Sequence, residues 1–129
     1  MANRLAPGKR PRSSMAPTIV LYQGRPLLVI GSPGGSSIIG YVLHTLLNVL
    51  DWGMNLQEAL HQPHILHRGG VLEMEPGGRN QALQAALEQQ GFSTRLTELN
   101  SGLHGIMLHQ DHLSGAADPR REGVALAAD

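Results

Sequence analysis

A glycine-rich loop from Gly31 to Ser37 is the part of this sequence whose residue types are best suited to chemistry. It follows an apolar run typical of a strand and precedes a helical pattern. Glycines reach positive φ angles that aim successive backbone N–H groups at one point, and a helix N-terminus adds partial positive charge. Such a loop can hold a phosphate or an oxyanion, or it can be a tight structural turn. The glycine spacings of Walker and dinucleotide-binding loops are absent, which disfavours phosphate.

Two adjacent serines, Ser13 and Ser14, form a second candidate site in a loop framed by Pro11 and Pro17. Their hydroxyl groups are donors suited to a carboxylate, and the prolines stiffen the backbone around them. Serine pairs also occur by chance in loops, so the pair alone is weak evidence for binding. No histidine or lysine base stands beside them in the sequence, so neither serine is predicted to be a nucleophile.

Three histidines, His61, His64 and His67, recur at every third position and raise the possibility of a metal site. Pro63 interrupts any continuous helix here, and side chains on an extended segment alternate between faces instead of converging. We therefore expect surface or half-buried histidines, and we predict no metal site.

Charged residues gather again near the end of the sequence, at Asp118, Arg120 and Arg121. They could form a buried ion pair. An exposed polar turn is the favoured interpretation, because most ion pairs lie at the protein surface.

The elements that position these residues follow from hydrophobic periodicity and turn signals. Residues 1–16 are rich in proline and charge and predict an extended loop. The next two apolar runs predict a hairpin whose second strand is buried on both faces, and Ser36 and Ser37 are expected to cap the helix that follows. Strands are predicted at 18–22, 26–30, 64–67, 71–75, 95–99, 105–109 and 112–117, and helices at 38–52, 55–60 and 80–90. This order indicates layered helices and a largely antiparallel sheet.

Composition limits the functions that this chain can have. Its 129 residues suffice for one domain, and ten basic residues balance ten acidic ones, so no net field favours nucleic acid or an anionic membrane. It contains no cysteine, and no apolar stretch approaches the length of a membrane span. No cofactor is predicted. The first residues lack a signal-peptide pattern, and the compartment stays open because an exported precursor would carry its signal further upstream.

Several blocks together resemble the γ-glutamyltranspeptidase family in order and spacing. They are Asn3, Pro7–Pro11, Ser13–Met15, Pro17–Ile19, Gly31–Ser36 and Gly115–Gly123. The resemblance implies an α+β fold, part of the N-terminal nucleophile (Ntn) hydrolase αββα architecture, with a largely antiparallel sheet and covering helices. It also implies that residues 1–129 are a single-domain fragment from the C-terminal part of the small subunit, and that residues 1–16 are an extended substrate-binding loop.

The same resemblance implies a chemistry. In the family a precursor cleaves itself, and the freed N-terminal threonine attacks the γ-glutamyl carbonyl of glutathione or a related donor, with its α-amine as base. Water or an amino acid or dipeptide then accepts the γ-glutamyl group. By motif, Ser13 and Ser14 would bind the substrate α-carboxylate, and the N–H groups of Gly34 and Gly35 would form the oxyanion hole.

The family's nucleophile has no counterpart among the threonines of this chain, which are Thr18, Thr45, Thr94 and Thr97. We therefore expect a chain that is inactive alone, with the missing upstream segment and the large subunit of the same enzyme as its partners. Unpaired strand edges could also favour a homo-oligomer. Two alternatives stay open, a non-catalytic protein that binds γ-glutamyl compounds and a structural interaction module.

Overall fold

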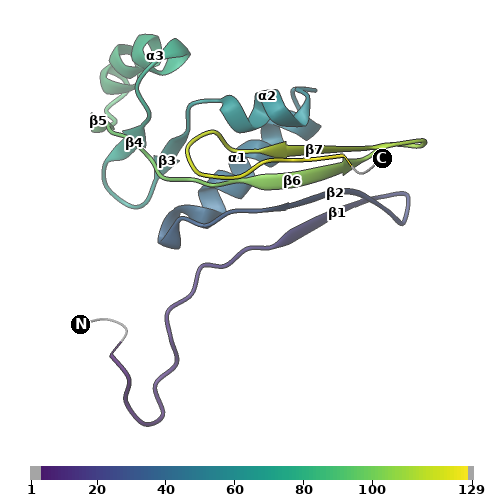
Figure 1. Ribbon diagram of the computed structural model, residues 1–129. Helices are drawn as coiled ribbons and strands as arrows, with labels where there is room; N and C mark the ends of the chain where they lie inside the picture. Colours follow the sequence, from purple (N-terminus) through teal and green to yellow (C-terminus); the bar gives the residue numbers. More distant parts are fainter. Residues whose placement is uncertain (1–3, 128–129) are drawn as a thin grey trace.

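A computed structural model describes residues 4–127 and shows a mixed α+β arrangement of two small sheets with helices (Figure 1). The larger sheet has four antiparallel strands in the order β1-β2-β6-β7. Its members are β1 (Thr18–Tyr22), β2 (Arg25–Gly31), β6 (His104–Leu108) and β7 (Leu113–Ala117). The predicted β1–β2 hairpin is confirmed, with Gln23 and Gly24 in its turn at positive φ.

The smaller sheet contains β3 (Ile65–His67), β4 (Leu72–Met74) and β5 (Thr94–Leu96). β3 and β4 are antiparallel, whereas β4 and β5 are parallel. A parallel pair needs a crossover, and helix α3 (Gly78–Gln89) supplies it. The prediction of largely antiparallel pairing is therefore confirmed, with β4–β5 as its exception.

Two helices lie against the larger sheet. A short 3-10 turn, η1 (Gly35–Ser37), leads into α1 (Ile38–Leu50), and α2 (Leu56–His61) follows. Asn55 caps α2 as predicted, because its Oδ1 accepts a hydrogen bond of 2.8 Å from the Glu58 N–H. Ser37 occupies the N-cap position of α1, but its side chain makes no capping hydrogen bond, so the predicted serine cap is wrong.

The core forms where α1 and α2 pack on one face of the larger sheet. Leu28 and Ile30 of β2 are buried against Tyr41 of α1 and Leu60 of α2. Burying an aliphatic or aromatic side chain of this size contributes about 1.5–3 kcal/mol. This contact fixes the end of β2, and with it the start of the glycine-rich loop.

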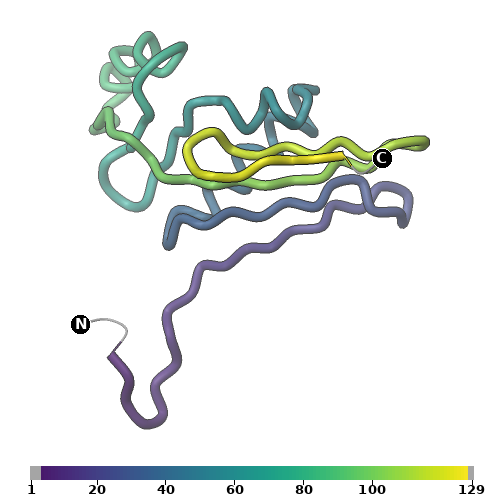
Figure 2. Tube along the Cα trace, in the orientation of Figure 1, coloured from purple at the N-terminus to yellow at the C-terminus, as the bar shows by residue number. Residues whose placement is uncertain are grey.

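The opposite face of the larger sheet is open. The pairing register sets Ile19, Val29 and Ile106 side by side, and these side chains are 63%, 39% and 47% exposed. The predicted burial of the second strand on both faces is therefore wrong. Within residues 4–127, this face meets chiefly the last segment of the chain, which runs along it so that Ala125 lies over Gly115 (Figure 2).

Helix α3 and the first described residues lie outside the core. Helix α3 forms as predicted, but Leu83 on its predicted apolar side is partly exposed and Asn80 is its buried residue. Residues 4–16 form neither helix nor strand and extend away from the body, which confirms the predicted extended conformation for those residues (Figure 2). Positions 1–3, including Asn3 of the family resemblance, and positions 128–129 lie outside the described residues. In the described part of the chain, no helix has the length and apolarity to cross a membrane.

Candidate functional site

The glycine-rich loop leaves the end of β2 and turns into η1. Gly34 and Gly35 have φ angles of 133° and 59°, a region that residues with a side chain rarely adopt. The prediction that this loop depends on glycine for positive φ is therefore confirmed. Its geometry turns the backbone through a sharp corner immediately before the helix.

Gly34 is also required by its packing. A Cβ atom at this position would lie 2.6 Å from Cε2 of Tyr41, whose ring is fully buried. The Tyr41 hydroxyl donates to Oδ1 of Asn100 at 3.4 Å and accepts from the Asn100 N–H at 3.3 Å. Asn100 thus fixes the position of the Tyr41 hydroxyl, and the Cε2 edge of the ring packs against the loop at Gly34.

A second brace comes from the segment before β6. The Ser32 hydroxyl donates to the Pro33 carbonyl at 2.7 Å and accepts from the Gly102 N–H at 3.2 Å. Among the described residues, the N–H groups of Gly34 and Gly35 make no hydrogen bond to another residue. The loop is therefore braced on both sides and keeps two backbone donors available for an anion or an oxyanion.

The serine pair lies on the extended segment ahead of β1. Ser13 is exposed and accepts a hydrogen bond of 3.3 Å from the Met15 N–H, whereas Ser14 is half-buried. Thr18 pairs with Ile30, so the serines stand at the same end of the sheet as the glycine-rich loop. No hydrogen bond in the described chain joins them to that loop. Their role in carboxylate binding therefore stays a prediction.

The structure contains a buried charged cluster, which we call the Asp118 cluster, where sequence reasoning favoured an exposed turn over a buried ion pair. It consists of His64, Glu75, Ser101, Asp118 and Arg120. Arg120 binds both oxygens of Glu75, with Nε to Oε1 at 2.7 Å and Nη2 to Oε2 at 2.6 Å, and its Nη1 donates to Oδ1 of Asp118 at 3.0 Å. Asp118 is only 1% exposed, so the favoured interpretation of an exposed polar turn is wrong.

Dedicated donors make this burial possible. Oδ2 of Asp118 accepts from the Ser101 hydroxyl at 2.5 Å and from the Leu103 N–H at 3.2 Å. Burial acts to raise the pKa of Asp118, but the hydrogen bonds from Ser101, Arg120 and Leu103 outweigh it and hold that pKa below its usual value. Burial likewise acts to lower the pKa of Arg120, and its bonds to Glu75 and Asp118 raise it instead. Both groups are therefore charged at neutral pH.

The expectation of surface or half-buried histidines is confirmed for His61 and His67 and is wrong for His64. His64 is fully buried, and its Nε2 lies 3.0 Å from the Ser101 hydroxyl. Burial and the nearby Arg120 lower the pKa of His64 to about 4. His61 and His67 are exposed and bond locally, to Gln57 and Gly70. The three side chains thus do not converge.

The sequence pattern of the γ-glutamyltranspeptidase family matches residues 1–128, across the loop and the cluster just described. The chain belongs to the γ-glutamyltranspeptidase family. It is 43% identical to a glutathione hydrolase proenzyme of Escherichia coli K12 over 92% of its own length. It is 36% identical to an acylase ACY 1 proenzyme of Pseudomonas sp. SE83 over 95% of its length. It spans 21% and 22% of these two relatives, so it corresponds to about a fifth of a complete protein.

The structural comparison agrees. The γ-glutamyltranspeptidase of Pseudomonas nitroreducens, solved in complex with L-DON, superposes with a TM-score of 0.84 at 30% identity. The match covers 100% of this chain and 69% of that one. The two small sheets and their helices are thus part of the γ-glutamyltranspeptidase structure.

The hydroxyl groups of the four threonines of this chain all make hydrogen bonds to nearby residues. Thr45 is fully buried on α1 and donates to the Tyr41 carbonyl at 3.0 Å. The Thr18 hydroxyl donates to the Ala16 carbonyl at 3.1 Å, and that of Thr94 bonds to Glu88. Thr97 directs its hydroxyl to the Glu98 carbonyl at 3.5 Å. None of them stands at a chain terminus with a free amine beside it.

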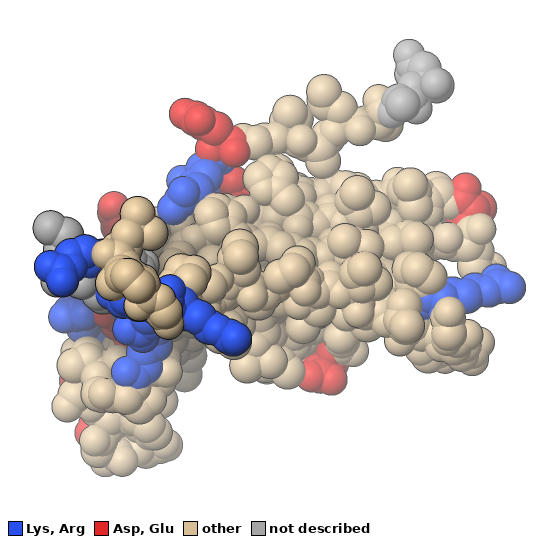
Figure 3. Space-filling model, turned by 90° about the horizontal axis from the view of Figure 1, so that it is seen from below, with Lys and Arg blue, Asp and Glu red and all other residues tan. Residues whose placement is uncertain are grey.

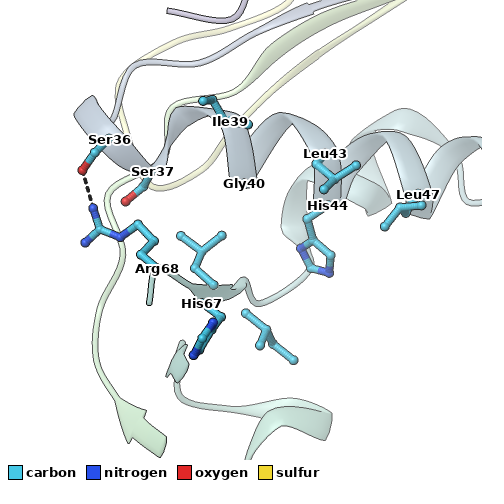
Figure 4. Close-up of a pocket in the computed structure, with 11 residues that line it drawn as sticks. Ser36, Ser37, Ile39, Gly40, Leu43, His44, Leu47, His67 and Arg68 are labelled. Carbon is cyan, nitrogen blue, oxygen red and sulfur yellow. Dashed lines mark hydrogen bonds between the residues drawn. The ribbon is translucent and has the colours of Figure 1, made fainter. Parts of the chain in front are cut away.

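A groove lies on the outer side of the molecule, between α1 and β3 (Figure 4). Its volume is about 410 Å³. One wall is an exposed apolar row on α1, Ile39, Leu43 and Leu47, and His44 lies on the same helix. At the other end, Arg68 donates to the hydroxyl of Ser36, the residue that follows the two loop glycines.

Proposed function

We propose that this chain is the C-terminal portion of the small subunit of a γ-glutamyltransferase that cleaves glutathione and related γ-glutamyl compounds. The observation that carries the proposal is the braced loop at the end of β2, with two glycines at positive φ and two unused N–H donors. In an acyl transfer these donors would stabilise the negative oxygen of the tetrahedral intermediate. Removing one such donor typically raises the barrier by about 3 kcal/mol.

Substrate recognition in this proposal comes from Ser13 and Ser14. Their hydroxyl groups would bind the α-carboxylate of the γ-glutamyl group. The pairing of Thr18 with Ile30 supports this role, because it brings the extended segment to the end of the sheet where the loop lies. Substrate would then lie between the segment and the loop.

The nucleophile would come from another part of the enzyme, an N-terminal threonine whose α-amine is the base. The local hydrogen bonds of all four threonine hydroxyls support this assignment.

The open sheet face and the β1 edge supply a surface for the missing parts. On the β1 side, the middle of the molecule is largely free of charged side chains, while Lys and Arg gather at one end (Figure 3). A second sheet packed on the open face would complete the αββα layers, and a second copy could use the same edge.

The test is hydrolysis of a chromogenic γ-glutamyl anilide by the 129-residue chain, alone and co-expressed with the remaining four-fifths of a relative's precursor. We expect no release by the chain alone and clear release by the complemented enzyme. Gly34→Pro or Gly35→Pro should remove most of the complemented activity, whereas Gly24→Ala in the distant β1–β2 turn is the control. Turnover by the chain alone, or full activity of both proline variants, would contradict the proposal.

A binding role without catalysis is the alternative, and the local hydrogen bonds of all four threonine hydroxyls favour it if complementation fails. The double variant Ser13→Ala, Ser14→Ala then separates two cases. Weaker binding of glutamate-like ligands by the variant would indicate a γ-glutamyl-binding protein. If neither the parent chain nor the variant binds such ligands, the chain would be a structural interaction module.

A further inference from the structure

The first turn of α1 packs closely against β3, and this contact determines what lies beside the glycine-rich loop. A Cβ atom at Gly40 would lie 2.4 Å from Cδ2 of Leu66, so a side chain there would displace the buried leucine. Ser36 precedes Gly40 by four residues, and Arg68 follows Leu66 by two, so each lies on the same side of the backbone as its partner in this contact. The close approach of helix and strand therefore brings Arg68 next to Ser36.

Arg68 reaches Ser36 from the turn that follows β3. Its Nη1 donates to the Ser36 hydroxyl, and its Nη2 donates to Oε2 of Glu73 at 3.4 Å (Figure 4). Within residues 4–127, no other side-chain hydrogen bond joins η1 to a distant part of the chain. The guanidinium group therefore links the small sheet to the turn at the end of the loop.

Glu73 in turn holds Arg68 in place. The register of the small sheet sets Leu66, Glu73 and Arg95 side by side, and Arg95 donates to Oε1 of Glu73. The hydrogen bond from Arg95, together with the charge of Arg68, outweighs desolvation and lowers the pKa of Glu73. The carboxylate is therefore ionised at neutral pH, and its second oxygen is an acceptor for Arg68.

The bond to Ser36 acts on the end of the loop that the other two braces leave free, since those act at or before Gly34. The Ser37 N–H donates to the Gly34 carbonyl at 3.2 Å and closes η1 over Gly35 and Ser36. Glycine has no side chain to limit rotation about its backbone bonds, so the direction of its N–H depends on neighbours that are held. Fixing Ser36 therefore limits how far the backbone at Gly35 can turn.

We propose that Arg68 is a positioning residue for the oxyanion-binding loop, which keeps the N–H groups of Gly34 and Gly35 aimed at one point through its bond to Ser36. This inference rests on the proposed function, because it concerns the same loop. Arg68 would not touch the reacting atoms, since its guanidinium group is engaged by Ser36 and Glu73. Without this anchor the two donors would diverge, which weakens binding of the transition state and leaves substrate binding unchanged.

The first test is NMR spectroscopy of the 129-residue chain without substrate. Arg68→Met removes the donors and keeps an unbranched side chain, and Ser36→Ala removes the acceptor. Each should shift the amide signals of Gly34 and Gly35 and broaden them by exchange, and the double variant should change them no more than either single variant. Arg95→Met takes a guanidinium group from Glu73 but none from Ser36, so it is the matched control and should leave the loop signals unchanged. Unchanged loop signals in Arg68→Met, or additive effects in the double variant, would overturn the proposal.

The second test is turnover of the γ-glutamyl anilide by the complemented enzyme. Arg68→Met should lower kcat about tenfold with KM nearly unchanged, a smaller loss than removal of a whole donor causes. Arg68→Lys can still donate to Ser36 and should recover part of the lost kcat. Arg95→Met should turn over substrate as the parent enzyme does. A raised KM with an unchanged kcat would mean that Arg68 binds substrate directly, which would overturn the positioning role.

The two tests separate this inference from the proposed function. If the complemented parent enzyme releases no product, the proposed function fails and the catalytic consequence of Arg68 fails with it. The loop signals then still decide whether Arg68 positions Gly34 and Gly35. If the parent enzyme is active and Arg68→Met is equally active, the proposed function stands and the positioning role is overturned.

Discussion

The two faces of the four-stranded sheet have opposite surroundings, although alternating residues of the same strands build them. On one face Leu28 and Ile30 are buried under α1 and α2. On the other face their neighbour Val29 stands in an exposed apolar row with Ile19 and Ile106. Both faces carry apolar residues, so hydrophobicity alone does not say which face is covered. The difference shows which face of the sheet this chain covers with its own helices and which face it leaves largely exposed.

The largest expected effect is on the covered side, where the Asp118 cluster joins α2, β3, β4 and β7. Arg120→Ala would leave Glu75 and Asp118 without their shared cation, and breaking such a buried pair costs about 3–5 kcal/mol. Arg95→Ala removes one of the two exposed arginine partners of Glu73, the other being Arg68, and should cost less than about 1 kcal/mol. Denaturant unfolding measures both, and equal losses would show that burial does not distinguish the two pairs.

Adjacent residues of β2 give the most direct comparison of the two faces. Leu28→Ala should lower the free energy of unfolding by about 2–5 kcal/mol, because it opens a cavity under α1 and α2. Val29→Ala on the open face should cost less than about 1 kcal/mol. A Val29→Ala loss as large as that of Leu28→Ala would mean that the open face is covered in solution beyond its contact with the last segment of the chain, as by a second copy.

Acid should lower the free energy of unfolding, and the groups responsible lie on the covered side of the sheet. The folded-state pKa of His64 is about 4 against an ordinary 6.5, so protons favour the unfolded chain, and stability is lost as pH falls from about 6.5 to about 4. The lowered pKa of Asp118 adds a loss in the same direction at lower pH. The His64 part amounts to about 3 kcal/mol. Unfolding curves at several pH values measure it, and His64→Gln should flatten them in this window.

The smallest expected effect on stability is on the open face. Ile19→Glu should change the free energy of unfolding of the chain alone by no more than about 0.5 kcal/mol, because the side chain is exposed. If the chain assembles as proposed with the remaining parts of a γ-glutamyltransferase, the same change should prevent that assembly, since it would bury an unpaired charge. Co-purification with those parts measures this, and Leu83→Glu on the exposed part of α3 is the control. Assembly that tolerates Ile19→Glu would place the partner elsewhere.

Local signals predicted much of the fold and part of the candidate site. The hairpin, the three helices and the asparagine cap of α2 follow from periodicity and turn chemistry, which act over a few residues. The glycines of the loop were predicted for the same reason, because a positive φ is a property of single residues. The motif blocks also sufficed to identify the family.

Other features depend on contacts between distant residues and could not be predicted from local patterns. Asp118 meets Ser101, and Arg120 meets Glu75, 45 residues away. Histidine spacing likewise gave no sign that His64 would be buried between Ser101 and His44.

By itself, then, the sequence determined the local conformations, the glycine-dependent loop and the membership of a family. The tertiary structure alone decided which face of β2 is covered, which charges are buried and which histidine lies in the core. The physical reason is that backbone preference and amphipathic period are properties of neighbours in the chain. Burial, ionisation and hydrogen-bond direction are set by whatever side chains the completed fold brings together.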